Sequence, residues 1–457
     1  MTIKVTAIFD IGRTNKKFFL FDSNFQEVYR EYTRFDEIED EDGYPTENLE
    51  ALENWVKKVF DKMFHSLEYE IKALNFSCYG ASLVHIDKNG KVVAPLYNYM
   101  KPLADDVYNS FYDKYGPENE LSRVTGSPRL GMLNTGMHLY WLKRTQPEVF
   151  KKIKYSLHLP QYLSYLFTEI PVSEYTSIGC HTMLWDFDKT DYHEWVYKEG
   201  IQAKLPPITS TKETRPINYQ GKTIQIGSGI HDSSSALLPY IRSISKRFVL
   251  VSTGTWSISI NPFNKEILSE EDLKNDGLFN MRVDGSRVKV SRLFLGNEYK
   301  LQVKGLSKHF NLPEAYHKQV KFDANIFSGI KKDFVPMFKW VSMIFEEMPK
   351  ETKIPYSDFE HAYHQLMLEL VLLQVKSIRA TVGDKDIEKL YVDGGFSDNE
   401  VYLELLSLYL SDMTLSTTDS SLGSALGAAI VISDVTLESK FLKKNYACKK
   451  HIPLISK

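Results

Sequence analysis

Two glycine turns hold side chains that suit phosphate binding. The first, DIGRTNKK (residues 10–17), follows the apolar run Val5 to Phe9, and the second, Thr253-Gly254-Thr255, joins the apolar runs Phe248 to Ser252 and Trp256 to Ile260. Backbone N–H groups of a tight turn converge on one point, and glycine lets the backbone approach a phosphate closely. One such turn is more often a plain hairpin. Because the same strand–turn–strand pattern occurs in both halves, we favour phosphate binding.

Asp10, at the end of the first apolar run, is a candidate magnesium ligand, acting through water. Hard cations on nucleotides prefer one or two carboxylates together with phosphate oxygens. The same turn adds Thr14, Asn15 and a basic residue at Lys16 or Lys17. The chain has no GxxxxGK[ST] and no GxGxxG, so the sequence predicts a phosphate site that differs from both of those motifs.

A third turn, VDGGFSDNE (residues 392–400), joins a short apolar strand to the start of a helix. Such a junction suits an anion or the flat face of a base beside glycine. A Gly-Gly before a helix is also common as a plain connection, and the residues leave both readings open.

The segment GSGIHDSSSALLPY, residues 227–240, places His231 and Asp232 between an apolar strand and the start of a helix. An aspartate in this position is commonly a helix cap. Here it lies near the seam between the two halves, where we expect a cleft. A carboxylate in that cleft would accept the proton of a substrate hydroxyl.

Composition argues against several other classes of protein. The chain has 457 residues, of which 43% are hydrophobic and 25% charged, and a net charge of -3, which gives no reason to expect nucleic acid or an anionic membrane as partner. Three scattered cysteines form no CxxC, so we expect no disulfide framework and a reducing compartment. The sequence has no HExxH zinc motif, no GxSxG, no signal sequence and no long apolar window. The default is a soluble cytoplasmic protein.

Apolar periodicity and turn signals predict the elements that position these residues. We expect strands at Val5–Phe9, Phe18–Phe21, Ile71–Ser77, Phe248–Ser252, Trp256–Ile260 and Leu390–Val392, a hairpin at Asn89-Gly90, and helices at Tyr44–Glu70, from Ser357 through Val382, from Ser397, and at Leu422–Ile432. Thr46 is the expected cap of the first helix, and Ser357 with Glu360 and Ser397 with Glu400 are expected capping boxes. His361 and His364 are expected to share a solvated helix face.

These motifs, together with LPQYLSYLFTEIPVSEYTS (residues 159–177), occur in an order and at spacings that resemble the FGGY family of carbohydrate kinases, most closely its L-rhamnulokinase and L-fuculokinase branch. The resemblance covers roughly residues 5 to 432. It implies an α/β fold of two actin-like (ribonuclease H-like) domains with an interdomain nucleotide cleft. We place these domains at residues 1–240 and 241–457.

The resemblance also implies ATP and Mg²⁺ as cofactors and assigns roles to particular residues. Asp10, Gly12, Thr14, Asn15 and Lys17 would face the phosphates and the metal, Gly254 and Thr255 would form the second loop, Gly394, Gly395 and Asn399 would face adenosine, and Asp232 would be the catalytic base. The corresponding sugar positions are Tyr79, Gly80, Ala81, Asn98, Lys101 and His231. Many family members carry Trp-x-Asp-x-Arg where this chain has YNYMKP, residues 97–102, so the sugar stays open.

The implied activity is ATP-dependent phosphorylation of a hydroxyl, at C1, of a ketose such as L-rhamnulose or L-fuculose. Xylulose, ribulose and glycerol-like polyols are alternative acceptors. A non-catalytic actin-like nucleotide-binding protein and a sugar sensor that does not phosphorylate are rivals from other classes. The expected partner is a small-molecule sugar, with neither nucleic acid nor membrane. The oligomeric state is open, and a homodimer is one option.

Overall fold

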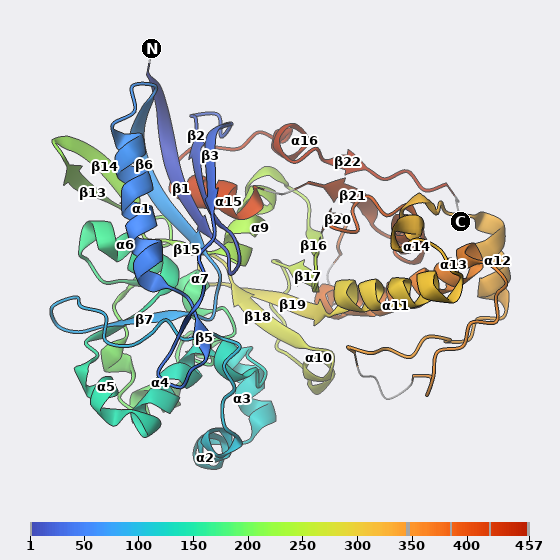
Figure 1. The fold of residues 1–457 in the computed structure, drawn as a ribbon, viewed down its shortest axis with the longest axis horizontal. Coiled ribbons are helices and arrows are strands. Elements are labelled where there is room, and N and C mark those ends of the chain that lie inside the picture. The colour runs from blue at the N-terminus through green and yellow to red at the C-terminus, as the bar shows by residue number, and fades with distance from the viewer. Residues whose placement is uncertain (1, 344–347, 384–385, 420–421, 455–457) are drawn as a thin grey trace.

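The computed structural model describes residues 2–343, 348–383, 386–419 and 422–454. Within these residues the chain forms two α/β lobes, each built around a seven-stranded mixed sheet (Figure 1). The first lobe holds the blue-to-green part of the chain, and most of the second is yellow to red (Figure 1). Among the described residues, no helix combines the length and apolar character needed to cross a membrane.

The first sheet has the strand order β13-β14-β6-β1-β2-β3, with β15 paired to β6. Its strands are β1 (Ile3–Ile11), β2 (Lys16–Phe21), β3 (Glu27–Thr33), β6 (Tyr69–Cys78), β13 (Thr214–Tyr219), β14 (Lys222–Gly227) and β15 (Ile230–His231). β1 runs antiparallel to β2 and parallel to β6, and β15 is also parallel to β6. The carboxyl ends of β1, β6 and β15 therefore meet at one edge, where Asp10 lies opposite Lys17 and beside Ser77.

The second sheet has the order β18-β19-β17-β16-β20-β21-β22. Its strands are β16 (Phe248–Thr253), β17 (Ser257–Asn261), β18 (Gly277–Met281), β19 (Arg287–Leu293), β20 (Lys389–Gly394), β21 (Thr414–Thr418) and β22 (Lys449–Lys450). β16 is antiparallel to β17 and parallel to β20, which repeats the arrangement of β1 with β2 and β6. The second and third glycine turns thus lie side by side, at the ends of β16 and β20.

Helices cover the sheets and connect the strands. In the first part of the chain they are α1 (Leu49–Phe64), α2 (Asp105–Tyr115), α3 (Glu118–Thr125), α4 (Thr135–Thr145), α5 (Pro147–Lys152), α6 (Leu159–Thr168), α7 (Tyr175–Ile178), α8 (Glu194–Lys198) and α9 (Asp232–Ser243). In the second part they are α10 (Glu270–Lys274), α11 (Leu295–His309), α12 (Ala324–Lys332), α13 (Phe359–Val382), α14 (Glu400–Tyr409), α15 (Gly423–Val431) and α16 (Phe441–Asn445). Short strand pairs complete the fold: β4 (Ile38–Glu39) with β5 (Pro45–Thr46), β7 (Leu83–Ile86) with β8 (Tyr155–His158), β9 (Ser173–Glu174) with β12 (Ile208–Thr209), and β10 (Trp185–Asp186) with β11 (Asp191–Tyr192).

Helix α15 comes from the second part of the chain but packs on α9 and on β1 and β6 of the first sheet (Figure 1). The small residues of its sequence allow this approach: a Cβ on Gly427 would lie 1.9 Å from the Ser235 carbonyl oxygen. Asn75 Nδ2 donates to the Ala428 carbonyl oxygen at 2.9 Å, which adds a polar contact. The prediction of a small-residue helix packed close to a neighbour is confirmed, and this helix pair ties the two lobes together.

A second contact between the lobes is made by β18. The Phe279 backbone N–H donates to the Gly126 carbonyl oxygen at 3.0 Å, and its ring packs on Phe187 with centroids 5.0 Å apart. Met281 lies against Gly179, where a Cβ would come within 2.2 Å of the methionine Cβ. Glycines at 126 and 179 thus let the edge of the second sheet reach the first lobe.

The expected strands and the helices around residues 50, 370 and 428 are present, but the predicted caps are wrong. Asn48 caps α1 through the Ala51 N–H, Asp358 caps α13 through His361 N–H, and Asn399 caps α14 through Tyr402 N–H. In each case an Asn or Asp directly before the first helical residue replaces a Ser or Thr farther upstream, because a cap must adjoin the first turn. The Thr46 hydroxyl instead donates to the Leu96 carbonyl oxygen.

Two further expectations need correction, and one is confirmed. The first helix is shorter than predicted, since α1 ends at Phe64 and β6 begins at Tyr69. His364 is buried and accepts the Asp323 N–H at 2.9 Å, so it does not share a solvated face with His361. The hairpin expected at Asn89-Gly90 is confirmed: Ile86 and Val92 form an antiparallel bridge across the turn, and the Val93 N–H donates to the His85 carbonyl oxygen at 2.9 Å. The longer partner of β7 is β8.

Candidate functional site

Asp232 is the first residue of α9 and follows β15 directly. Its Oδ1 accepts the Ser233 backbone N–H at 2.6 Å and the Ser233 hydroxyl at 3.2 Å. The carboxyl group is largely desolvated, which raises its pKa to about 6, although the Ser233 hydrogen bonds act in the opposite direction. The side chain keeps 31% exposure, so a substrate can reach it. A carboxylate with this pKa suits proton transfer close to neutral pH.

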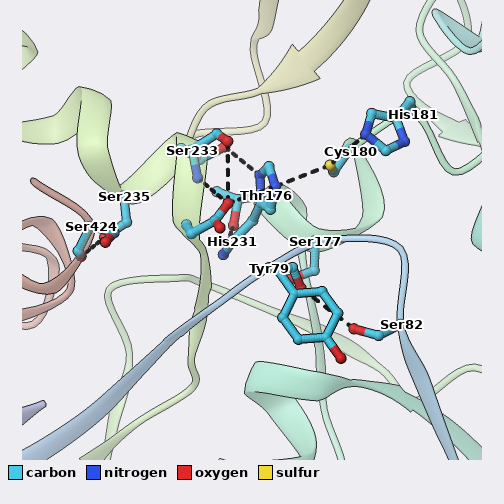
Figure 2. Close-up of polar contacts among 12 residues, drawn as sticks. Tyr79, Ser82, Thr176, Ser177, Cys180, His181, His231, Ser233, Ser235 and Ser424 are labelled. Carbon is cyan, nitrogen blue, oxygen red and sulfur yellow. Dashed lines mark hydrogen bonds and ion pairs between the residues drawn. The ribbon is translucent and has the colours of Figure 1, made fainter. Parts of the chain in front are cut away.

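His231 lies beside this carboxylate, with Nε2 at 3.2 Å from Asp232 Oδ1. The same nitrogen is 3.1 Å from Cys180 Sγ, a contact drawn in Figure 2. Burial lowers the pKa of His231 to about 4, so the imidazole is neutral at pH 7. A neutral imidazole supplies no positive charge to Asp232, which leaves that carboxylate basic.

A buried carboxylate, Glu174, organises the backbone around His231. It is fully buried and accepts four short hydrogen bonds, from the Thr176 N–H and hydroxyl, the Ser177 N–H and the Thr211 hydroxyl, at 2.6 to 2.8 Å. The Thr176 hydroxyl oxygen in turn accepts the His231 N–H at 3.0 Å. Burial raises the pKa of Glu174 despite these bonds. No sequence pattern indicated this role for Glu174. Nothing in the segment EYTS, residues 174–177, indicates that the Thr176 hydroxyl will bind the backbone of His231.

Asp10 faces the same region from the end of β1. It is 6% exposed, accepts the Ser424 hydroxyl at 2.8 Å, and has Lys17 Nζ at 3.6 Å. Desolvation raises its pKa, Lys17 and Ser424 lower it, and the charge of Asp232 raises it further. The two carboxylates therefore share one electrostatic environment. Of the two lysines, Lys17 is beside Asp10, whereas Lys16 is buried and paired with Glu47 at 2.8 Å.

The first turn is closed by the Gly12 N–H, which donates to the Asn15 carbonyl oxygen at 3.0 Å. Thr14 and Asn15 are exposed, and the Asn15 side chain accepts Arg34 Nε at 2.7 Å. Asp10 thus has an exposed polar turn directly after its strand, as a phosphate loop requires.

The second turn is held from behind by α11. A Cβ on Gly296 would be 1.9 Å from the Gly254 carbonyl oxygen, and the Asn297 N–H donates to the Thr255 carbonyl oxygen at 3.1 Å. On its own side Gly254 is open, because a Cβ there would meet nothing closer than Trp256 O at 3.8 Å. Gly296 supports the turn, and the sequence did not indicate this. Only glycine fits at position 296 because of its contact with Gly254, which lies 42 positions earlier in the chain.

The third turn is joined to the second by hydrogen bonds. Gly394 has φ +87°, and a Cβ there would lie 2.1 Å from the Thr253 carbonyl oxygen. The Gly395 N–H donates to that same oxygen at 2.6 Å, and the Thr253 hydroxyl accepts the Phe396 N–H at 3.0 Å. Gly394 therefore has a packing reason to be glycine. Asn399 uses its amide within the protein, as the α14 cap and as a donor to the Tyr363 hydroxyl at 2.9 Å.

The sugar candidates fall into two groups. Tyr79, Gly80 and Ala81 follow β6 next to His231, and a Cβ on Gly80 would be 3.1 Å from His231 Nε2. Tyr79 packs on Tyr99 with ring centroids 6.1 Å apart. Desolvation and the charge of Asp232 both raise the pKa of Tyr99, which places this tyrosine, not among the candidates, near the carboxylate.

The side chains of Asn98 and Lys101 bind residues in and next to the β4–β5 strand pair. Asn98 Nδ2 donates to the Pro45 carbonyl oxygen at 2.8 Å. Lys101 Nζ is 2.6 Å from a carboxylate oxygen of both Asp40 and Asp42. Their assignment to the sugar stays a prediction, and these contacts give both residues a structural role.

Residues 5–238 match the model of the FGGY family of carbohydrate kinases, N-terminal domain, and residues 245–440 match carbohydrate kinase FGGY, C-terminal domain. A rhamnulokinase of Halalkalibacterium halodurans is 24% identical over 258 residues, 54% of each chain, and one of Mannheimia succiniciproducens is 24% identical over 298 residues, 61% of this chain and 58% of the relative. The chain spans about half the length of the curated relatives it matches.

Solved structures show the same fold. A carbohydrate kinase from Novosphingobium aromaticivorans has a TM-score of 0.81 at 20% identity, covering 100% of this chain and 95% of its own. A ligand-bound xylulose kinase from Lactobacillus acidophilus has a TM-score of 0.76 at 13% identity, covering 99% and 94%. The two-lobed α/β architecture expected from the sequence is confirmed.

Proposed function

The chain belongs to the FGGY family of carbohydrate kinases, and from this premise we propose that it transfers the γ-phosphoryl group of ATP to a hydroxyl of a ketose. The observation that carries the proposal is Asp232, a reachable carboxylate with a pKa raised to about 6, whose charge also raises the pKa of Asp10. The rhamnulokinases among the relatives favour a six-carbon deoxyketose such as L-rhamnulose or L-fuculose, phosphorylated at C1.

The residues around Asp10 fit magnesium ATP. A divalent cation would offset the burial that raises the pKa of Asp10 and would favour its ionised form. A single carboxylate suits Mg²⁺, which takes its other ligands from phosphate oxygens and water. When bound, the cation would neutralise charge on the transferring phosphoryl group. Gly12, Thr14 and Lys17 would hold one part of the triphosphate and Gly254 with Thr255 another, while Gly395 and Asn399 would face adenosine.

In this scheme Asp232 orients the acceptor hydroxyl and takes its proton as the new oxygen–phosphorus bond forms. Ser233 fixes the carboxylate through two hydrogen bonds, and neutral His231 leaves its charge uncompensated. The rings of Tyr79 and Tyr99 provide apolar faces for the carbon side of a sugar. We propose a domain boundary near residue 240, within the last turn of α9, which ends at Ser243 before β16 begins at Phe248.

The pH dependence of the reaction should report the ionisation of Asp232. The raised pKa, about 6, means that kcat/KM for the sugar should fall about tenfold per pH unit below that value, because the protonated carboxyl cannot accept a proton. Initial rates at saturating magnesium ATP, measured from about pH 5 to about pH 8, check this. A profile that is flat over this range, or a limb that persists in Asp232→Asn, would contradict the assignment.

Substitution of Gly254 tests the second loop without disturbing packing. Because a Cβ there enters open space, Gly254→Val should fold normally but obstruct the approach of a phosphate. We expect the Kd for magnesium ATP to rise about tenfold or more, the effect of one lost hydrogen bond to a charged group. Gly305→Val in α11 is the matched control, since a Cβ on Gly305 meets nothing within 4 Å. Calorimetric titration that shows equal affinity for both variants would remove Gly254 from the site.

A coupled assay of ADP release over a panel of ketoses and polyols tests the acceptor. The proposal predicts saturable, sugar-dependent turnover with deoxyketoses preferred. Turnover with xylulose, ribulose or glycerol-like polyols instead would support kinase activity but assign a different acceptor. Sugar binding without turnover would favour the alternative of a sugar sensor that does not phosphorylate.

A further inference from the structure

A small pocket lies next to His231 on the sugar side of the site. Its wall includes Tyr79, Gly80, Ser82, His158, Ser177 and His231. Its volume is about 10 Å³, the room that one water-sized group needs. The pocket is therefore too small for a sugar ring and fits a single oxygen atom with its hydrogen.

Ser177 is the residue of this wall whose hydroxyl oxygen can still accept a hydrogen bond. Its side chain is 5% exposed, and its Oγ makes no well-aligned hydrogen bond among the described residues. The hydroxyl acts against the burial that raises the pKa of Glu174, so its proton is directed to that carboxylate and the lone pairs of the oxygen are left for a ligand hydroxyl. A buried acceptor without a donor costs free energy, which a ligand hydroxyl in the pocket would recover. Ser82, on the same wall, differs because its hydroxyl donates to the Tyr79 carbonyl oxygen at 3.4 Å.

Both sides of the pocket are fixed by the same buried carboxylate. The Ser177 N–H donates to Glu174 Oε1 at 2.6 Å, and the Thr176 hydroxyl links Glu174 to the His231 N–H. This chain of hydrogen bonds fixes the position of Ser177 relative to His231. Figure 2 shows Ser177 close to Tyr79 on one side and His231 with Cys180 on the other.

The pocket adjoins the proposed base. His231 contributes to its wall and also lies 3.2 Å from Asp232 Oδ1. Neighbouring carbons of a sugar carry neighbouring oxygens, so a hydroxyl held at Asp232 brings the next oxygen of the chain towards this pocket. Burial lowers the pKa of His158 to about 3 and that of His231 to about 4, so both rings are neutral and the pocket suits a neutral oxygen.

We propose that Ser177 is a specificity-determining residue, whose hydroxyl binds the sugar oxygen on the carbon next to the reacting hydroxyl. The inference rests on the proposed function for the identity of the ligand as a sugar. It assigns to Ser177 the recognition of one oxygen atom and leaves proton transfer to Asp232.

The test compares Ser177→Ala with Ser164→Ala, on the best sugar of the panel and on its analogue with hydrogen in place of that neighbouring oxygen. Ser164 is a buried serine, 2% exposed, that does not line the pocket and whose hydroxyl donates to the Gly227 carbonyl oxygen at 2.7 Å. We expect Ser177→Ala to lower kcat/KM for the full sugar about 10- to 100-fold and to change the value for the analogue little. The discrimination ratio falls by the same factor, and KM for ATP is unchanged. Ser164→Ala should leave the ratio at the wild-type value.

Equal losses with sugar and analogue would overturn the proposal, because they would indicate a general structural effect. No loss with either the sugar or the analogue would also overturn it and would mean that the pocket holds only solvent. Ser177→Thr keeps the hydroxyl but adds a methyl group to a space for one water, so it should impair the full sugar more than the analogue. If the wild-type protein binds sugars without turnover, the proposed function fails, and the same ratio is measured from Kd values in calorimetry.

Discussion

Replacement of Asp232 by asparagine is expected to lower kcat by about two to four orders of magnitude, the usual contribution of a positioned general base. Asparagine keeps the shape and can still accept the Ser233 hydrogen bonds, but it cannot take the proton of the acceptor hydroxyl. Affinity for ATP should be nearly unchanged, because Asp232 contacts no phosphate in this scheme. Steady-state kinetics on the best sugar, together with calorimetric ATP binding, measure both quantities.

The stability of this variant provides an internal control. The folded-state pKa of Asp232 is raised from 3.8 to about 6, so ionising it costs stability as the pH rises through that interval. At pH 7 the asparagine variant should therefore have a Tm equal to or higher than that of the wild type. Asp113→Asn, at an exposed position of α2, is the matched control and should retain full activity. Near-normal turnover in Asp232→Asn would exclude the role, and lost ATP binding would place the residue with the metal.

Replacement of Asp10 by asparagine is the second substitution with a large expected effect. The change removes the carboxylate proposed to hold magnesium, and we expect kcat/KM for magnesium ATP to fall roughly 10²- to 10³-fold, as when one electrostatic stabiliser of a transition state is lost. Asparagine can still accept the Ser424 hydroxyl, so the junction between β1 and α15 is preserved. Initial rates against free Mg²⁺ at saturating ATP test this, with a shift to higher Mg²⁺ expected.

Ser424→Ala separates the two roles of this contact. It removes the hydrogen bond to Asp10 but keeps the carboxylate, so its effect should be at most about tenfold, the value of one hydrogen bond. If Asp10→Asn has the same magnesium dependence as the wild type, the metal is held elsewhere. If Ser424→Ala lowers kcat/KM as much as Asp10→Asn does, the hydrogen bond between the two residues matters for the structure of the site, and the loss in Asp10→Asn is not evidence for metal binding.

The strands and glycine turns could be predicted because their signals are local. An apolar run followed by glycine and threonine marks a strand end at residue 10 and again at residue 253, and both turns are present. Helix caps were harder to predict, because several polar residues precede each helix and the sequence does not indicate which one adjoins the first turn. Asn48, Asp358 and Asn399 hold these positions.

The partners of the site could not be predicted, because they come from distant parts of the chain. Ser424 meets Asp10 across 414 positions, and Thr176 meets His231 across 55. Gly296 must be glycine only because α11 packs on the second turn. Lys101 aligned with a sugar-binding position of the family, yet its ammonium group pairs with Asp40 and Asp42, a pairing that local sequence does not reveal.

The central claim, phosphoryl transfer from ATP to a ketose with Asp232 as the base, is tested most directly by ³¹P NMR of the reaction with magnesium ATP and the best ketose of the panel. The account predicts that the γ-phosphate signal is replaced, mole for mole with ADP, by the signal of a sugar phosphomonoester at C1, and that Asp232→Asn forms this product at a rate lower by orders of magnitude. Formation of ADP with inorganic phosphate alone, or no conversion with any ketose, would contradict it.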